Sequence, residues 1–431
     1  MAKQKSVIYG GQDFFPLSNT RNILTNKIFL TLFAVFIFRL GNSIPLTNVD
    51  QEALKKAFLQ AENKNAIMQI LNMYSGTGGL NELVTVFSLG IIPFINASIV
   101  VDLLTALFPS LEKLQQEEGE AGRRTLNFYK KILSLIFAII QTTIVINYIK
   151  PYLYNTGFYS MFSIGITLVA GAMLVIWISN QIETKGVGNG TSIIILLNIL
   201  ANLPSRDSLF NTIGPESSVE LVFLFFISGL ILITQTARFE IPIVSARQLS
   251  FTNDMEKNNV LEAKVRDQFI QKNSLNIRLS QAGIFPIIIA ANILPFLSYL
   301  VGGFVPKVII NVFYYFLIVI FNFFYTTIFW DPAKIAEQLR KSSVSITGTT
   351  PGKPTEEFLS RKVEAVSLAG GVFLCGILIL YDSFKFIRQT TLLNQLNISS
   401  LMIVIGVTYE LQKTIRAMYK NVIVIEKETI I

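Results

Sequence analysis

The sequence predicts an all-α protein that crosses a membrane many times, and three observations support that prediction. Of the 431 residues, 51% are hydrophobic, only 15% are charged, and Phe alone accounts for 34. A soluble chain of this length would carry more charge and divide into several domains. Apolar stretches recur along the whole chain at lengths suited to helices in a bilayer, and Lys and Arg are concentrated in alternate connecting segments.

Ten apolar stretches are predicted as membrane spans. They are Lys27–Phe38, Phe87–Leu107, Ile132–Tyr148, Tyr159–Ser179, Thr191–Leu203, Val219–Thr236, Ala282–Leu300, Val308–Phe329, Val363–Tyr381 and Ile398–Leu411. The first, fifth and tenth are short or interrupted by polar residues, so they need protein neighbours more than lipid. The expected organisation is an N-terminal segment 1–26, a first half 27–203, a second half 204–411 and a C-terminal tail 412–431.

The basic residues predict the orientation of the chain. With the N-terminus inside, 27 of the 36 Lys and Arg residues fall on the inner side and 8 on the outer side, and Arg39 lies in the first span. Inner loops of membrane proteins carry such an excess of positive charge. Both termini are therefore expected to be cytoplasmic, or stromal if the membrane belongs to a plastid. The net charge of +8 is then explained without a nucleic-acid substrate.

Residues that carry catalysis are scarce in this chain. It has no histidine, and its one cysteine, Cys375, lies in an apolar run and is expected to be a packing residue. The sequence contains neither a GxSxG nucleophile elbow nor a Walker loop, so it cannot power movement by itself. An intramembrane enzyme is therefore a poor alternative, and no cofactor or metal is expected. A secondary transporter of a small solute remains the stronger alternative, because ten spans and the intramembrane Asp102 permit it.

A glycine-rich segment before the second span indicates an enclosed path. Residues 73–86 include GTGG and are followed by a long apolar helix. A half-length polar segment cannot cross a hydrocarbon core about 30 Å thick, so it must lie within protein or in a watery cavity. In the second span, Asp102 follows Asn96 and Ser98 and is expected to face the protein interior or water.

Two inner loops are too long to be simple connectors. They run over 237–281 and 331–362, and the second contains DPAKIAEQLRKS, a helix-like stretch. Loops of this size usually carry function or bind partners, although a solvated surface loop is the alternative.

Eight segments, in order and with matching spacing, resemble SecY, the central subunit of the protein-translocation channel. They are FRLGNSIPL at Phe38–Leu46, LNMYSGTGGL at Leu71–Leu80, SLGIIPFINASIVVDLLT at Ser88–Thr105, EEGEAGRRTLNFYKK at Glu117–Lys131, GVGNGTSIII at Gly186–Ile195, QAGIFPIIIA at Gln281–Ala290, FFYTTIFWDPAKIAEQLRKS at Phe323–Ser342 and TPGKPTEEFLSR at Thr350–Arg361. The resemblance therefore covers nearly the whole chain.

The resemblance implies ten transmembrane helices in two inverted five-helix halves around an hourglass pore. It implies a protein-conducting channel that passes unfolded preproteins across the membrane and releases hydrophobic segments sideways into lipid. The expected partners are a SecE-like small subunit, a SecG-like subunit, and the SecA motor ATPase or the ribosome as the source of energy. The expected location is a plastid thylakoid membrane or a bacterial plasma membrane, and the sequence leaves these two open.

The resemblance also assigns roles to particular residues. The pore ring would be Ile91, Ile95, Ile195, Ile288 and Ile403. The plug, near 75–84, would include Gly76, Gly78, Gly79 and Leu80. The lateral gate would carry Asn96, Ser98, Asp102 and Asn292. Partner docking would use Arg238, Arg247, Lys353 and Arg361.

Three positions depart from the family pattern. Asp102 stands where bacterial relatives commonly have glutamine, and Glu240 and Thr350 stand where arginine is usual. The two missing arginines put the details of motor docking in question.

Overall fold

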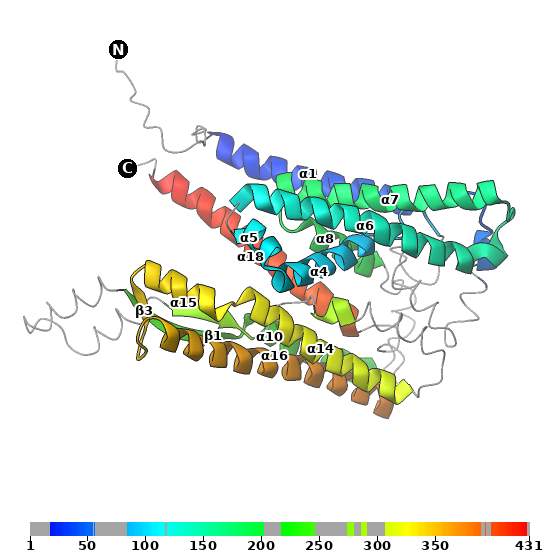
Figure 1. Ribbon diagram of the computed structural model, residues 1–431. Coiled ribbons are helices and arrows are strands. Elements are labelled where there is room, and N and C mark those ends of the chain that lie inside the picture. Colours follow the sequence, from blue (N-terminus) through cyan, green and yellow to red (C-terminus); the bar gives the residue numbers. More distant parts are fainter. Residues whose placement is uncertain are drawn as a thin grey trace, which may run out of the picture.

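The computed structural model describes residues 18–54, 56, 84–116, 119–201, 217–245, 274–279, 286–290, 307–388, 393 and 398–428. Its helices form two groups (Figure 1). The first group contains α1, α6, α7 and α8, and the second contains α10, α14, α15 and α16. Helices α4, α5 and α18 lie between the two groups, and α18 packs against both α8 and α10.

The elements follow the sequence in order. Those of the first part of the chain are α1 (Ser18–Asn42), α4 (Ile92–Leu107), α5 (Pro109–Gln116), α6 (Gly119–Ile149), the 3₁₀ turn η1 (Lys150–Tyr152), α7 (Phe158–Lys185) and α8 (Gly190–Ala201). Those of the second part are α10 (Ser217–Thr236), β1 (Arg238–Ser245), β2 (Ser274–Arg278), α14 (Lys307–Phe329), α15 (Pro332–Lys341), β3 (Val344–Ile346), α16 (Lys353–Arg388) and α18 (Ile398–Glu428). The predicted boundary between the halves, near residue 203, lies at the edge of a region outside the described residues.

Within the described ranges, five helical stretches are long and apolar enough to cross a membrane. They are Gly119–Asn147, Phe158–Lys185, Ser218–Thr236, Val312–Lys341 and Lys353–Ile387, and each overlaps a predicted span. Helices α1, α4, α8 and α18 coincide with four further predicted spans. The seventh predicted span, Ala282–Leu300, is described only over 286–290, which is helical, so the count of ten stays a prediction.

The outward faces of these helices are strongly apolar. Ile136 and Ile140 on α6, Trp177 on α7 and Phe225 on α10 are all about half exposed or more. Exposing an apolar surface of this extent to water costs free energy, whereas contact with the hydrocarbon of a bilayer does not. The exposed surface therefore supports the membrane prediction independently of helix length.

The second predicted span is shorter as a helix than the sequence indicates. Helix α4 begins at Ile92 rather than at Phe87, because the chain turns through Gly90, whose φ is +56°. Its 16 residues rise by about 24 Å, which is less than the roughly 30 Å of a hydrocarbon core. This helix packs against α6 and so depends on protein neighbours over part of its length.

The GVGNG motif allows α7 and α8 to approach closely. Gly188 has φ +84°, a conformation that favours glycine, and Asn189 accepts hydrogen bonds from the backbone N–H groups of Thr191 and Ser192 at the start of α8. A Cβ atom on Gly190 would lie 1.9 Å from the carbonyl oxygen of Ser179 on α7. Only glycine therefore fits at position 190.

Parts of the two long inner loops fold into a small antiparallel sheet with the strand order β2-β1-β3. Strand β1 pairs with β2 from Arg238 opposite Arg278, and with β3 from Ile243 opposite Ile346. Ile241, Ile277 and Ile346 pack against α16, the helix that begins at Lys353. The sequence predicted long inner loops here and did not reveal the strands, because the paired residues lie about 30 to 40 positions apart for β1 and β2 and about a hundred for β1 and β3.

The sheet lies at the same end of the molecule as the first and the last described residues of the chain. The first residues of α1, the last residues of α18, α15 and the sheet all lie at the left of Figure 1. The side of the membrane that this end faces stays a prediction, and we call it the inner end.

Candidate channel constriction and lateral seam

All five isoleucines predicted for the pore ring meet in one apolar cluster. Ile91 and Ile95 come from the start of α4, Ile288 from the helical piece 286–290, and Ile403 from α18; these four are at most 9% exposed. Ile195 on α8 is half-buried and packs against them. The cluster joins helices of the first group with the start of α4, α18 and the helical piece 286–290.

The geometry of α4 aims two of these side chains at the cluster. The backbone N–H of Ile95 donates to the carbonyl oxygen of Ile91 at 3.1 Å, which places them one helical turn apart on one face. Phe38 of α1 stacks on Phe87 with ring centroids 6.1 Å apart and supports the entry into α4 from behind. Branched and aromatic side chains of this kind form a dense, water-excluding closure.

A second, smaller contact joins α4 to the second group of helices. Ile289 and Tyr325 are buried there, and Ile99 of α4 packs with Phe321 and Phe324 of α14 against them. We call this contact the lateral seam. The resemblance expects the lateral gate between the second and third spans on one side and the seventh and eighth spans on the other. This contact joins the second of them, α4, to the eighth, α14, and to the described part of the seventh, 286–290.

The residues predicted for the lateral gate have different environments. Asn96, Ser98 and Asp102 on α4 are all half-buried. The carboxylate of Asp102 forms an ion pair with Lys130 of α6 at 2.8 Å and lies within electrostatic reach of Tyr325 across the seam. Asn292 lies outside the described residues. The Lys130 partner was missed, although an acidic residue in a span generally requires one.

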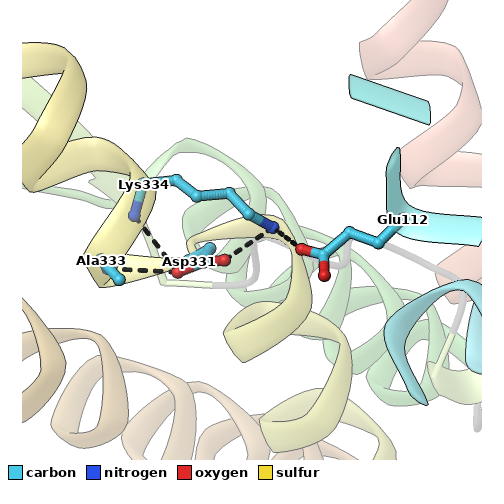
Figure 2. A network of polar contacts seen from close by, with 4 residues as sticks. All are labelled: Glu112, Asp331, Ala333 and Lys334. Atoms are coloured by element: carbon cyan, nitrogen blue, oxygen red, sulfur yellow. Dashed lines mark hydrogen bonds and ion pairs between the residues drawn. The ribbon is translucent and has the colours of Figure 1, made fainter. Parts of the chain in front are cut away.

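At the inner end, three charges converge where α5 meets α15 of the second group (Figure 2). Lys334 of α15 donates to a carboxylate oxygen of Glu112 on α5, and its ammonium also lies 2.7 Å from the carboxylate of Asp331. Asp331 is in addition the N-cap of α15, accepting from the backbone N–H groups of Ala333 and Lys334 at 3.1 and 3.3 Å. Sequence reasoning did not find this bridge, because 222 positions separate its two sides.

The three described docking residues of the prediction lie on the inner end. Arg238 is exposed on β1, and Lys353 and Arg361 are exposed on α16. Arg247 lies outside the described residues, as do the plug residues Gly76, Gly78, Gly79 and Leu80.

Three basic side chains, Arg238, Arg278 and Lys413, lie near one another where the sheet approaches α18. Arg238 lies opposite Arg278 in the register of β1 and β2. Desolvation, together with the nearby guanidinium groups of Arg278 and Arg238, lowers the pKa of Lys413 on α18 below its ordinary value. Lys362 lies 5.3 Å from the ring centre of Phe239, an interaction that holds β1 against α16.

Metal chemistry has no visible basis in the part of the chain that the structure describes. No group of three or more His, Cys, Asp or Glu side chains is arranged there to hold an ion. The described Cys375 is a buried free thiol that donates to the carbonyl oxygen of Tyr315 at 3.2 Å. Its environment is that of a packing residue.

Comparison with known proteins shows the class. The SecY family model matches residues 85–412. Protein translocase subunit SecY of Guillardia theta is 34% identical over 418 residues, covering 91% of this chain and 94% of that protein. The SecY of Synechocystis sp. is 33% identical over 426 residues and is covered over 91% of both chains. The relatives thus include plastid and cyanobacterial forms.

Solved structures have the same fold. A protein-conducting channel aligns with a TM-score of 0.61 at 13% identity, covering 92% of this chain and 93% of that one. Sec61 in a canine ribosome–channel complex aligns with a TM-score of 0.55 at 13% identity, with the same coverage. The fold is therefore that of the solved channel structures. The chain belongs to the SecY family, whose members are channel subunits of the protein translocase and not enzymes.

Proposed function

We propose that the chain passes unfolded preproteins through its centre and releases hydrophobic segments sideways into lipid. The observation that carries the proposal is the convergence of Ile91, Ile95, Ile195, Ile288 and Ile403 in one apolar cluster. A narrow ring of branched apolar side chains expels water, and ions then lose their hydration without replacement. The same side chains can move apart around a polypeptide of varied sequence.

The lateral seam supports the second part of the proposal. Its packing joins α4 to α14 and 286–290 through a few apolar side chains, and half-buried polar residues lie on the same stretch of α4. Interhelical hydrogen bonds in membranes contribute only about 1 kcal/mol each. We infer that Asn96, Ser98, Asp102 and Asn292 keep the closed seam marginally stable, so that a hydrophobic segment can part it.

The inner end is the proposed docking face for partners. Arg238, Arg247, Lys353 and Arg361 would receive a SecA-type motor or a ribosome, with SecE-like and SecG-like subunits beside the helices. Solved relatives include Sec61 and the yeast Ssh1 complex bound to ribosomes. In this proposal the inner end faces the stroma of a plastid thylakoid or the cytoplasm of a bacterium, and the segment containing Gly76, Gly78, Gly79 and Leu80 closes the opposite side.

The seal can be tested by conductance. Ile91→Ser, Ile195→Ser and Ile288→Ser should wet the constriction and raise the ion conductance of the resting channel in planar bilayers. Ile139→Ser provides the matched control, because Ile139 is 51% exposed on the outward face of α6. Unchanged conductance in the three ring variants would contradict the assignment of the ring.

A further inference from the structure

We propose that Glu112, Lys334 and Asp331 form an ion latch that sets how hydrophobic a segment must be to leave the channel through the lateral seam. The proposal rests on the proposed lateral release and adds specificity-determining residues to it. Figure 2 shows the three side chains converging between α5 and the start of α15.

The latch joins extensions of the two helices that form the seam. Helix α5 follows α4 after Phe108 alone, and the backbone N–H groups of Leu111 and Glu112 both donate to the Phe108 carbonyl oxygen. Helix α15 follows α14 after a similarly short turn, in which the backbone N–H of Trp330 donates to the carbonyl oxygen of Thr326 at 2.9 Å. Separating α4 from α14 must therefore pull Glu112 away from Lys334.

The arrangement also allows the latch to open. Lys334 has three donors, and it reaches Asp331 as well as Glu112. Asp331 belongs to the same short helix as Lys334, so this ion pair survives when Glu112 departs. Opening then leaves Lys334 with one carboxylate partner rather than with none.

The exposure of the latch makes its contribution modest. The side chains of Glu112, Lys334 and Asp331 are 36%, 39% and 33% exposed, so water screens their attraction. A pair of this exposure shifts an opening equilibrium by about two- to fivefold. A shift of that size changes which borderline segments are released, and leaves strongly hydrophobic segments unaffected.

A neighbouring ion pair provides the matched control. Glu337 and Lys341 form an ion pair at 2.9 Å on the same helix α15, with no role in joining α15 to α5. Glu337→Gln thus removes one carboxylate from the same helix without touching the latch. Asp102 and Lys130, in contrast, pair two helices on one side of the seam.

The test uses the full chain with its partner subunits in proteoliposomes, and preproteins that carry a test segment of graded leucine content. The fraction of segments released into lipid is measured by alkaline extraction. In Glu112→Gln and Lys334→Gln, release of borderline segments should rise about two- to fivefold. The double variant should show the same fold increase in release as either single variant, and not the product of the two increases, because both substitutions remove the same interaction. Raised salt should increase release in the wild type, and not in Glu112→Gln.

A covalent lock gives an independent measurement. Glu112→Cys combined with Lys334→Cys, in a Cys375→Ser background, should be cross-linked by a bismaleimide whose spacer contains a reducible disulfide, because two cysteines at the backbone positions of a lysine and a glutamate are too far apart for a direct disulfide. The cross-link should block release while fully exported preproteins still pass. Reduction of the cross-link should restore release.

The outcomes separate the two proposals. If the wild type exports preproteins and releases no segment at any leucine content, the proposed lateral release is wrong. If the wild type releases segments, but Glu112→Gln, Lys334→Gln and Glu337→Gln share its threshold, the latch is wrong. Undiminished release through the cross-linked form would overturn the latch as well.

Discussion

The candidate constriction and the inner end of this molecule are held together by different means. At the constriction, four isoleucines from Ile91 to Ile403 are at most 9% exposed and pack without charge. At the inner end, Glu112, Lys334 and Asp331 connect α5 to α15, and their side chains are 33–39% exposed. Removing buried apolar atoms lowers the free energy of unfolding roughly in proportion to the number of atoms removed. Water screens the attraction between exposed charges, so an exposed ion pair contributes little to that free energy. We therefore expect a tight seal at the centre and an easily opened contact at the inner end.

The largest expected effect comes from removing a fully buried aromatic side chain behind the constriction. Phe38 is 1% exposed and stacks on Phe87, so Phe38→Ala should reduce the free energy of unfolding by about 3–5 kcal/mol. Thermal unfolding in detergent measures the loss. Phe36→Ala is the control, because Phe36 lies on the same helix and is 59% exposed. Equal losses for the two variants would show that α1 is not anchored at the constriction.

A moderate effect is expected from crowding the α7–α8 contact that holds Ile195. In Gly190→Ala the new methyl group would lie 1.9 Å from the Ser179 carbonyl oxygen, so the helices must separate. The expected loss of stability is about 1–3 kcal/mol, with raised resting conductance as Ile195 shifts. Gly376→Ala is the control, because the added methyl group would meet no atom within 4 Å apart from its chain neighbours and the adjacent backbone of its own helix. A neutral Gly190→Ala would mean that α7 and α8 adjust freely.

The smallest expected effects concern the charges of the inner end. Lys353→Glu combined with Arg361→Glu should slow the association of a motor or ribosome more than the corresponding Gln pair, because repulsion is added to the lost attraction. Neutralisation should slow association by about two- to fivefold and weaken its dependence on salt. Titration in nanodiscs measures the association rate and its dependence on salt. In the same assay, Thr350→Arg should strengthen the docking of a bacterial motor.

The control for docking is a basic residue of another region. Lys150→Glu changes an exposed charge at η1, at the opposite end of α6 from the inner end. Association rates that respond equally to Lys150→Glu and to the Lys353 and Arg361 changes would point to net charge alone and away from a defined docking surface.

For some parts of the candidate site the sequence predicted both the residues and their neighbours, and for others it predicted the residues alone. The five ring isoleucines were assigned through the SecY resemblance, and the structure brings them together; their sealing role stays a prediction. Asp102 was expected to face protein or water, and its Lys130 partner went unnoticed. Apolar periodicity marks which residues avoid water, but it does not reveal which distant residue each one meets.

By itself, the sequence determined the class of the protein and located the five long apolar helices that the structure describes. Hydropathy and charge act locally, so a window of about twenty residues contains that information. The tertiary structure alone decided the bridge from Glu112 to Lys334 and the pairing of Ile243 with Ile346. These contacts join residues about one hundred to two hundred positions apart. Only the packing of whole helices brings such residues together, because no local preference of the backbone records a partner at that separation.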